Sequence, residues 1–125
     1  MASQLDSSYG SYLNANAAIL PAFTAVILTS AASNPPSIDL TGNGGALLFG
    51  VTQEDIAIAG TGRVKLRSGD GTVKLRTGAA VTAGTAYSIN ASGVAIAITT
   101  APNDVGRVLC VSAAGSGGVG EFQFI

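Results

Sequence analysis

The side chains best suited to chemistry in this chain are basic, and most of them lie in a repeated segment. VKLRSG at residues 64–69 recurs as VKLRTG at residues 73–78, and basic and apolar residues alternate in each copy. Side chains on a strand point to opposite faces with a period of two. The repeat therefore predicts a cationic β-hairpin with a glycine-containing turn between its strands. Its outward face would carry four basic candidate residues, Lys65, Arg67, Lys74 and Arg76.

This cationic face has two interpretations. It is either a docking surface for an acidic partner or a solvated face whose charges stop an edge strand from aggregating. Nucleic acid is a weaker candidate, because aromatic residues are not interleaved with the basic ones and the net charge of the chain is −1. We expect no direct nucleic-acid partner.

Residues suited to catalysis or metal binding are scarce. The chain has no histidine, which removes the most common general base and metal ligand. Glu54 and Asp55 are adjacent carboxylates, but neighbours on a strand point apart and would not form an acid–base couple. Cys110 is the single cysteine and lies in the apolar run RVLCVSA, which is typical of a buried thiol. We expect no enzymatic activity, no cofactor and no metal site.

The composition indicates an all-β protein whose surface is partly covered by other subunits. Seventeen glycines and four prolines accompany many small and β-branched residues, which suits short strands joined by tight turns. Charged residues make up only 10% of the chain, compared with about 25% in ordinary soluble domains. A surface with so few charges favours burial against partner proteins.

Residues 1–18 are expected to form an N-terminal arm. They are small, polar and punctuated by tyrosine, without a sustained period, so they would be disordered alone or ordered by lying on a neighbour. Tyr9, Tyr12 and Leu13 are the candidates for partner contacts, because tyrosine gives a large contact area at low entropic cost. The apolar stretch 13–32 contains asparagines and a proline and has no flanking basic residues, so we expect no membrane span.

Residues 19–125 are expected to form a single β domain. The pattern predicts a first strand at residues 23–28 and a turn followed by a short strand at residues 52–60. Further strands are predicted for a hairpin at 86–90 and 94–99, for 103–113, and for 119–125, where Phe122 and Phe124 share a face. Roughly eight to ten strands at this spacing favour an antiparallel β-sandwich or small barrel, with the extended N-terminal arm attached.

The order of these segments resembles the capsid cement (decoration) proteins of tailed bacteriophages. The resemblance rests on ILPAFTAVILT, LLFGVTQEDI, GTVKLRTGAAVTAGTAYSINASGVAI and DVGRVLCVSAAGSGGVGEFQFI, in that order, across residues 19–125. It implies a small all-β virion protein on the outer capsid surface, with the major capsid protein as its partner. It also implies a homotrimer, with a dimer as the alternative.

The residues and the resemblance together favour a passive structural function. We expect the chain to staple neighbouring capsid subunits and so to stabilise the head against the pressure of packaged DNA. A virion-borne carbohydrate-binding or adhesion module is the alternative, although sugar sites need exposed aromatic platforms and the chain has only three tyrosines. A self-assembling shell or tube component is a third possibility.

Overall fold

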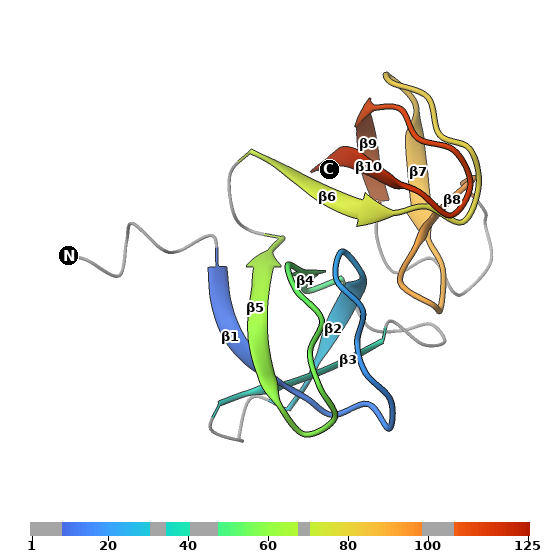
Figure 1. Ribbon diagram of the computed structural model, residues 1–125. Helices are drawn as coiled ribbons and strands as arrows, with labels where there is room; N and C mark the ends of the chain where they lie inside the picture. Colours follow the sequence, from blue (N-terminus) through green and yellow to red (C-terminus); the bar gives the residue numbers. More distant parts are fainter. Residues whose placement is uncertain (1–8, 31–34, 41–47, 68–70, 99–106) are drawn as a thin grey trace.

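The computed structural model describes residues 9–30, 35–40, 48–67, 71–98 and 107–125. These residues form ten strands and no helix, which confirms the all-β expectation. The strands fall into two halves that are contiguous in sequence: a closed five-stranded barrel followed by a five-stranded sheet. The chain passes from the barrel to the sheet once, after residue 66 (Figure 1).

The barrel has the strand order β1-β3-β2-β4-β5, and β5 pairs with β1 to close it. Its strands are β1 (Tyr9–Asn14), β2 (Ala25–Ser30), β3 (Ser37–Leu40), β4 (Gly50–Thr52) and β5 (Thr61–Leu66). All neighbouring strands are antiparallel except β1 and β3, which run parallel. Alternate residues point inward, and the barrel core consists of Leu20, Val26, Ile38, Ile56 and Val64.

The second half is a sheet with the strand order β6-β10-β9-β7-β8. Its strands are β6 (Thr72–Arg76), β7 (Ala86–Ile89), β8 (Ala95–Ile96), β9 (Arg107–Ser112) and β10 (Val119–Phe124). The predicted hairpin around residues 91–93 is confirmed as β7–β8. Phe122 is fully buried and Phe124 packs against the same core, so their shared face is also confirmed.

The two halves share part of their apolar core. Ala25, Leu48 and Val51 belong to the barrel half, yet they pack in one cluster with residues of the second sheet such as Val73 and Phe122. The backbone amide of Ala25 also donates to the carbonyl oxygen of Gly93, in the β7–β8 turn, at 2.9 Å. The seam between the halves is therefore packed and hydrogen-bonded.

The expected cationic hairpin is wrong. The first VKLR copy lies in β5, which pairs with β1 and β4, whereas the second lies in β6, which pairs with β10. Each copy has its own apolar face to bury: Val64 packs in the barrel core, and Val73 and Leu75 pack in the core of the second sheet. Alternation fixes which face of a strand is apolar but not which strand lies beside it. Residues 68–70 of the expected turn lie outside the described residues.

The expected arm also differs from the structure. Tyr9–Asn14 form β1, a strand of the barrel, and residues 1–8 lie outside the described part of the chain. Pairing with β5 on one side and β3 on the other satisfies the backbone of this polar segment. One of its inward side chains is buried Asn14. Because this inward residue is polar, the segment lacks the alternation of apolar and polar residues that predicts a strand.

Three smaller differences concern the loops of the barrel. The first expected strand begins later, at Ala25, because Phe23 has a φ of 62° in a turn. The short strand expected within residues 52–60 is only an isolated bridge between Ile56 and Leu20. Strand β3 was not expected, because it directly follows Pro35 and Pro36 and is only four residues long.

Candidate binding surface

Lys65 is buried, contrary to the expectation that its side chain faces outward. In the β1–β5 register it lies opposite Tyr9, yet only 6% of it is exposed. Its Nζ donates to the carbonyl oxygen of Thr72 at 2.9 Å and lies 5.6 Å from the centre of the Tyr9 ring. The start of β6 lies beside this amine, so the side chain links β5 to β6 instead of facing solvent.

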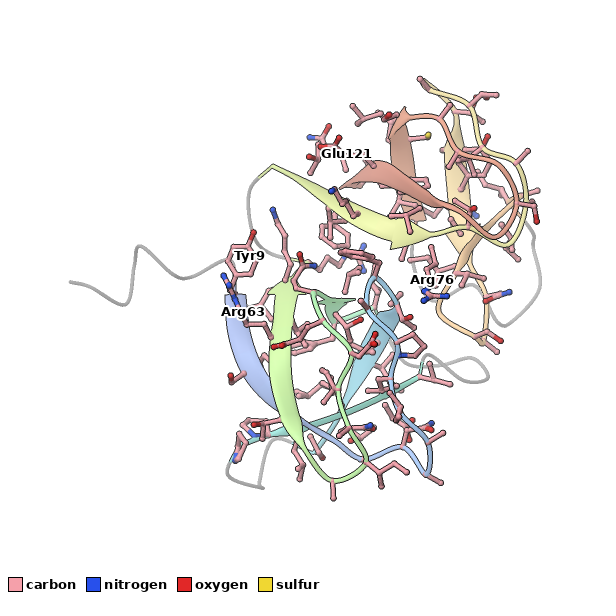
Figure 2. All side chains as sticks on the ribbon, viewed as in Figure 1. Tyr9, Arg63, Arg76 and Glu121 are labelled. Atoms are coloured by element: carbon pink, nitrogen blue, oxygen red, sulfur yellow. The ribbon has the colours of Figure 1, made fainter. Side chains whose placement is uncertain are left out.

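Arg67 and Arg76 also bridge the two halves. The Arg67 guanidinium donates to the carbonyl oxygen of Ile125 at 3.2 Å. Nε of Arg76 donates to the carbonyl oxygen of Ala22 at 3.0 Å, at the seam that Figure 2 shows. Arg67 follows β5 and Ile125 follows β10, while Arg76 ends β6 and Ala22 precedes β2. Three of the four basic candidates therefore hydrogen-bond across the seam to backbone carbonyls.

Lys74 is exposed and, unlike Arg76, makes no hydrogen bond across the seam. It lies opposite Glu121 in the β6–β10 register, which places opposite charges on neighbouring strands. The Glu121 carboxylate accepts a hydrogen bond from the Thr72 hydroxyl. Within the described part of the chain, the amine of Lys74 makes no hydrogen bond or ion pair. It is therefore free to meet an acidic partner.

Tyr9 and Tyr12 lie on opposite faces of β1 and do not act together. Tyr12 points into the barrel, where its ring meets Phe49 edge-on with centroids 5.0 Å apart. Leu13 pairs with Thr61 on one side and Ser37 on the other, and is partly buried. Of the three N-terminal candidates, Tyr9 has the most direct contact with charged groups.

Arg63 is a basic residue that the sequence reasoning did not select. Its guanidinium lies 4.7 Å from the centre of the Tyr9 ring, a cation–π contact, and the residue is exposed. Figure 2 shows the two labelled side chains next to each other beside β1 and β5. Arg63 stands two residues before Lys65, so strand periodicity puts them on one face and could have identified it.

The carboxylates of Glu54 and Asp55 accept hydrogen bonds from backbone amides of the barrel. Glu54 accepts a hydrogen bond from the backbone amide of Arg63 at 2.9 Å, and Asp55 accepts one from the amide of Ala22 at 2.7 Å. The two carboxylates therefore bond to different segments, and neither residue lies in a strand. Among the residues described, no group of three histidine, cysteine, aspartate or glutamate side chains could hold a metal ion.

Cys110 is a buried thiol, as expected. Only 1% of it is exposed, and its Sγ lies 3.4 Å from the carbonyl oxygen of Ser112. Burial raises the pKa of the Cys110 thiol, and this hydrogen bond partly offsets the rise. A thiol held protonated in this way is a poor nucleophile.

The described residues also contain no helix long and apolar enough to cross a membrane.

A closed barrel followed by a second five-stranded sheet also occurs in a solved structure. The fold resembles a phage head-fibre protein. One solved structure with this fold is the head fiber gp8.5 N base in bacteriophage phi29, with a TM-score of 0.64, 13% identity and 94% of each chain covered. The likeness to the head-fibre base spans both halves, so the seam lies within the shared fold. No family model and no curated protein matches the sequence.

Proposed function

We propose that the chain is a structural protein of a phage virion that attaches to the head. The observation that carries this proposal is the fold shared with the phi29 head-fibre base across 94% of both chains. The order of glycine turns and strands that resembles the capsid cement proteins supports the same assignment independently. In this proposal the protein works through its surfaces.

The finer proposal is that the protein binds the outer capsid surface and staples neighbouring subunits. A packed, hydrogen-bonded seam makes the two halves a stiff unit, which can transmit force between two footings. An oligomer, most simply a trimer, would engage several major capsid protein subunits at once. Such multivalency raises the apparent affinity by about 10²–10⁴ without any new kind of contact.

The surface proposed to contact the shell is the exposed cationic one. Arg63, which stacks on the Tyr9 ring, and Lys74 are exposed and donate no side-chain hydrogen bond to a backbone carbonyl, whereas Lys65, Arg67 and Arg76 each do. Arg63 and Lys74 therefore replace the earlier set of four as the residues that would meet an acidic patch on the shell. Screening by salt should weaken such contacts.

Co-sedimentation with empty heads of the encoding phage tests the proposal. The unaltered chain should pellet with the heads, and Arg63→Gln with Lys74→Gln should lower the retained fraction more at low salt than at high salt. Arg107→Gln, an exposed charge removed from β9, is the matched control and should bind normally. A chain that never pellets with heads contradicts the assignment. Equal losses at both salt concentrations contradict the cationic contact.

The adhesion alternative receives less support from the positions of the tyrosines. Tyr12 and Tyr87 pack in the two cores, and the Tyr9 ring is covered by the Arg63 guanidinium. None of the three offers a free aromatic platform for a sugar ring. A glycan array that gave specific binding would nevertheless favour that alternative over capsid stapling.

A further inference from the structure

The two halves of the molecule have the same strand topology, with β1–β5 corresponding in chain order to β6–β10. Strand β1 pairs antiparallel with β5 and parallel with β3. Strand β6 pairs antiparallel with β10, and Thr77, the residue after β6, forms a parallel bridge to Ala95 in β8. The three remaining pairings of each half are antiparallel and join corresponding strands. The chain is therefore an internal structural duplication.

The correspondence extends to the register of the strands. In the barrel, one row of side chains across β2, β4 and β5 consists of Ala25, Val51 and Lys65. In the second half, the row with the same register across β7, β9 and β10 consists of Ala86, Leu109 and Gln123. Both rows point away from the core of their own half, because the next residues along each strand, such as Val64 and Phe122, point into it.

The loops that precede β2 and β7 also correspond. They share the pattern Ala-x-Thr-Ala, at residues 22–25 and 83–86. The second residue of each pattern has a positive φ, 62° at Phe23 and 86° at Gly84. Its backbone amide donates at 2.8 Å to a carbonyl oxygen at the same register, that of Thr52 in β4 or Cys110 in β9. The two loops therefore have the same structure.

In the barrel half, this loop holds the end of β6. The backbone amide of Arg76 donates to the carbonyl oxygen of Phe23 at 2.8 Å, and its Nε donates to that of Ala22 at 3.0 Å. Figure 1 shows β6 at the boundary between the two halves. A strand end that presents a free backbone amide and a guanidinium therefore fits this loop.

The row of the barrel half covers the rest of β6. Ala25 and Val51 are fully buried, and they pack in one cluster with the apolar side chains of β6, Val73 and Leu75. Nζ of Lys65 donates to the carbonyl oxygen of Thr72 at 2.9 Å. The loop and the row together form one docking site for a strand in which apolar and basic residues alternate.

The second half has the same docking site, and there it is uncovered. Ala83 and Gly84 are exposed, and no described residue donates a hydrogen bond to their carbonyl oxygens. Ala86 and Leu109 are only half-buried, whereas their counterparts in the barrel are fully buried. Gln123 is exposed, and its side-chain amide supplies a donor in the place of the lysine amine of the barrel.

We propose that the second half uses this site to bind an extended segment of another protein, in which apolar and basic residues alternate as they do in β6. The apolar side chains of the segment pack on Ala86 and Leu109, and its arginine donates to the carbonyl oxygens of the loop before β7. Gln123 donates to its backbone. The ligand is basic, whereas the cationic surface is proposed to meet an acidic patch, so the two proposals can fail separately.

A second copy of this chain does not offer such a segment. Its β6 is already docked on its own barrel. Its β1, which corresponds to β6, has Leu13 in the place of Arg76. The backbone amide of Leu13 donates to the carbonyl oxygen of Pro36 at 3.0 Å, so it is not free to donate to the loop. The site therefore suits a different protein.

A synthetic peptide of residues 71–77, GTVKLRT, is the probe for this site, because it contains the strand that fills the equivalent site of the barrel. Titrated into the isotope-labelled full chain, it should shift the amide NMR signals of Gly84, Thr85 and Leu109. The equivalent signals of the barrel should stay in place, because β6 covers them: Phe23, Thr24 and Val51. No shift, or shifts confined to the barrel, overturns the proposal.

A second peptide with glutamine in place of the arginine tests the role of the guanidinium. It should bind roughly tenfold more weakly, because it loses a hydrogen bond from a charged donor. Equal affinities of the two peptides overturn the proposal.

Two serine variants of the full chain test the position of the site. Leu109→Ser should weaken binding of GTVKLRT roughly tenfold, because an apolar contact is lost. Val119→Ser, a change at an exposed valine of β10 outside the row, is the matched control and should bind the peptide normally. Equal effects of the two variants overturn the proposal. Self-association that Leu109→Ser removes, measured by sedimentation equilibrium, would show that a second copy occupies the site and would also overturn it.

Discussion

Arg76 donates its backbone amide to the carbonyl oxygen of Phe23 at 2.8 Å, while its Nε donates to the preceding carbonyl, that of Ala22. One residue at the end of β6 thus holds two successive carbonyls of the loop that leads into β2. The positive φ of Phe23, 62°, is an unusual conformation for a bulky side chain. The bonds from Arg76 help to keep this strained turn at the seam between the halves.

Replacing Arg76 with glutamine should loosen the seam. The variant keeps the backbone bond to Phe23 but loses the guanidinium bond to Ala22, so the free energy of unfolding should fall by about 1 kcal/mol. Lys74→Gln is the matched control, because it removes the same charge from an exposed position on the same strand. Chemical denaturation measures both, and equal effects would show that Arg76 contributes only its charge.

Adding a methyl group at Gly93 should wedge the halves apart. A Cβ there would lie 2.5 Å from the carbonyl oxygen of Ala25 and 2.6 Å from Cγ2 of Thr24, both in the barrel half. Gly84 has a similar positive φ, but no atom lies within 4 Å of its Cβ position. We expect Gly84→Ala to cost about 1 kcal/mol from backbone strain alone.

Gly93→Ala should cost at least about 2 kcal/mol more than that, because overpacking adds to the same strain. Thermal denaturation of the two variants side by side isolates the steric part. An equal loss of stability in both variants would contradict this account, because it would mean that the β7–β8 turn shifts to admit the methyl group without a measurable cost in free energy.

Removing the Asn14 side chain should loosen the two barrel loops that it joins, the one that contains Ala18 and the one that contains Ile56 and Ala57. Asn14 is 2% exposed and its amide donates to three carbonyl oxygens, so Asn14→Ala should lower the free energy of unfolding by about 2–4 kcal/mol. Asn14→Asp keeps the shape but turns a carboxylate toward the same carbonyls, and should be worse at neutral pH. Urea denaturation would contradict this role if the aspartate variant matched the unaltered chain.

Cys110 should be protected from thiol reagents until the protein unfolds. Burial raises its pKa, so the folded state holds the proton while the unfolded chain releases it first as the pH rises. The stability linked to this group is complete below the ordinary thiol pKa and is lost as the pH rises toward the higher folded value. Denaturation between neutral and alkaline pH should therefore show a steeper decline than in Cys110→Ala. Identical slopes, or fast labelling by Ellman's reagent without denaturant, would contradict this account.

The positions of the basic residues change the meaning of the repeated segment. A hairpin with two basic strands would present its charges to a partner at the surface. The two copies instead lie in β5 of the barrel and β6 of the second sheet. Lys65 and Arg67, from the first copy, and Arg76, from the second, donate to carbonyls of the opposite half. Hydrogen bonds from charged donors stabilise a fold more than hydrogen bonds between neutral groups. The basic residues of the repeat therefore help to hold the two halves of the molecule together.

The all-β class, most strand positions and many core residues could be predicted from the amino-acid sequence. Val64, Val73, Leu75 and Phe122 are buried as their alternation predicts, and Cys110 lies among apolar neighbours. These features follow from the period of two along a strand, which is a property of neighbouring residues. A local pattern can be read without knowing what lies across the molecule.

The pairing of the strands and the exposure of the charged side chains could not be predicted from the sequence and are known from the fold. The VKLR copies belong to different sheets, Lys65 is buried beside Thr72, and Tyr9 and Tyr12 face opposite sides of β1. Each outcome depends on residues far apart in the chain, such as Arg76 meeting Ala22 or Arg67 meeting Ile125. Strand pairing and burial are set by these distant contacts, and alternation along one segment carries no information about them.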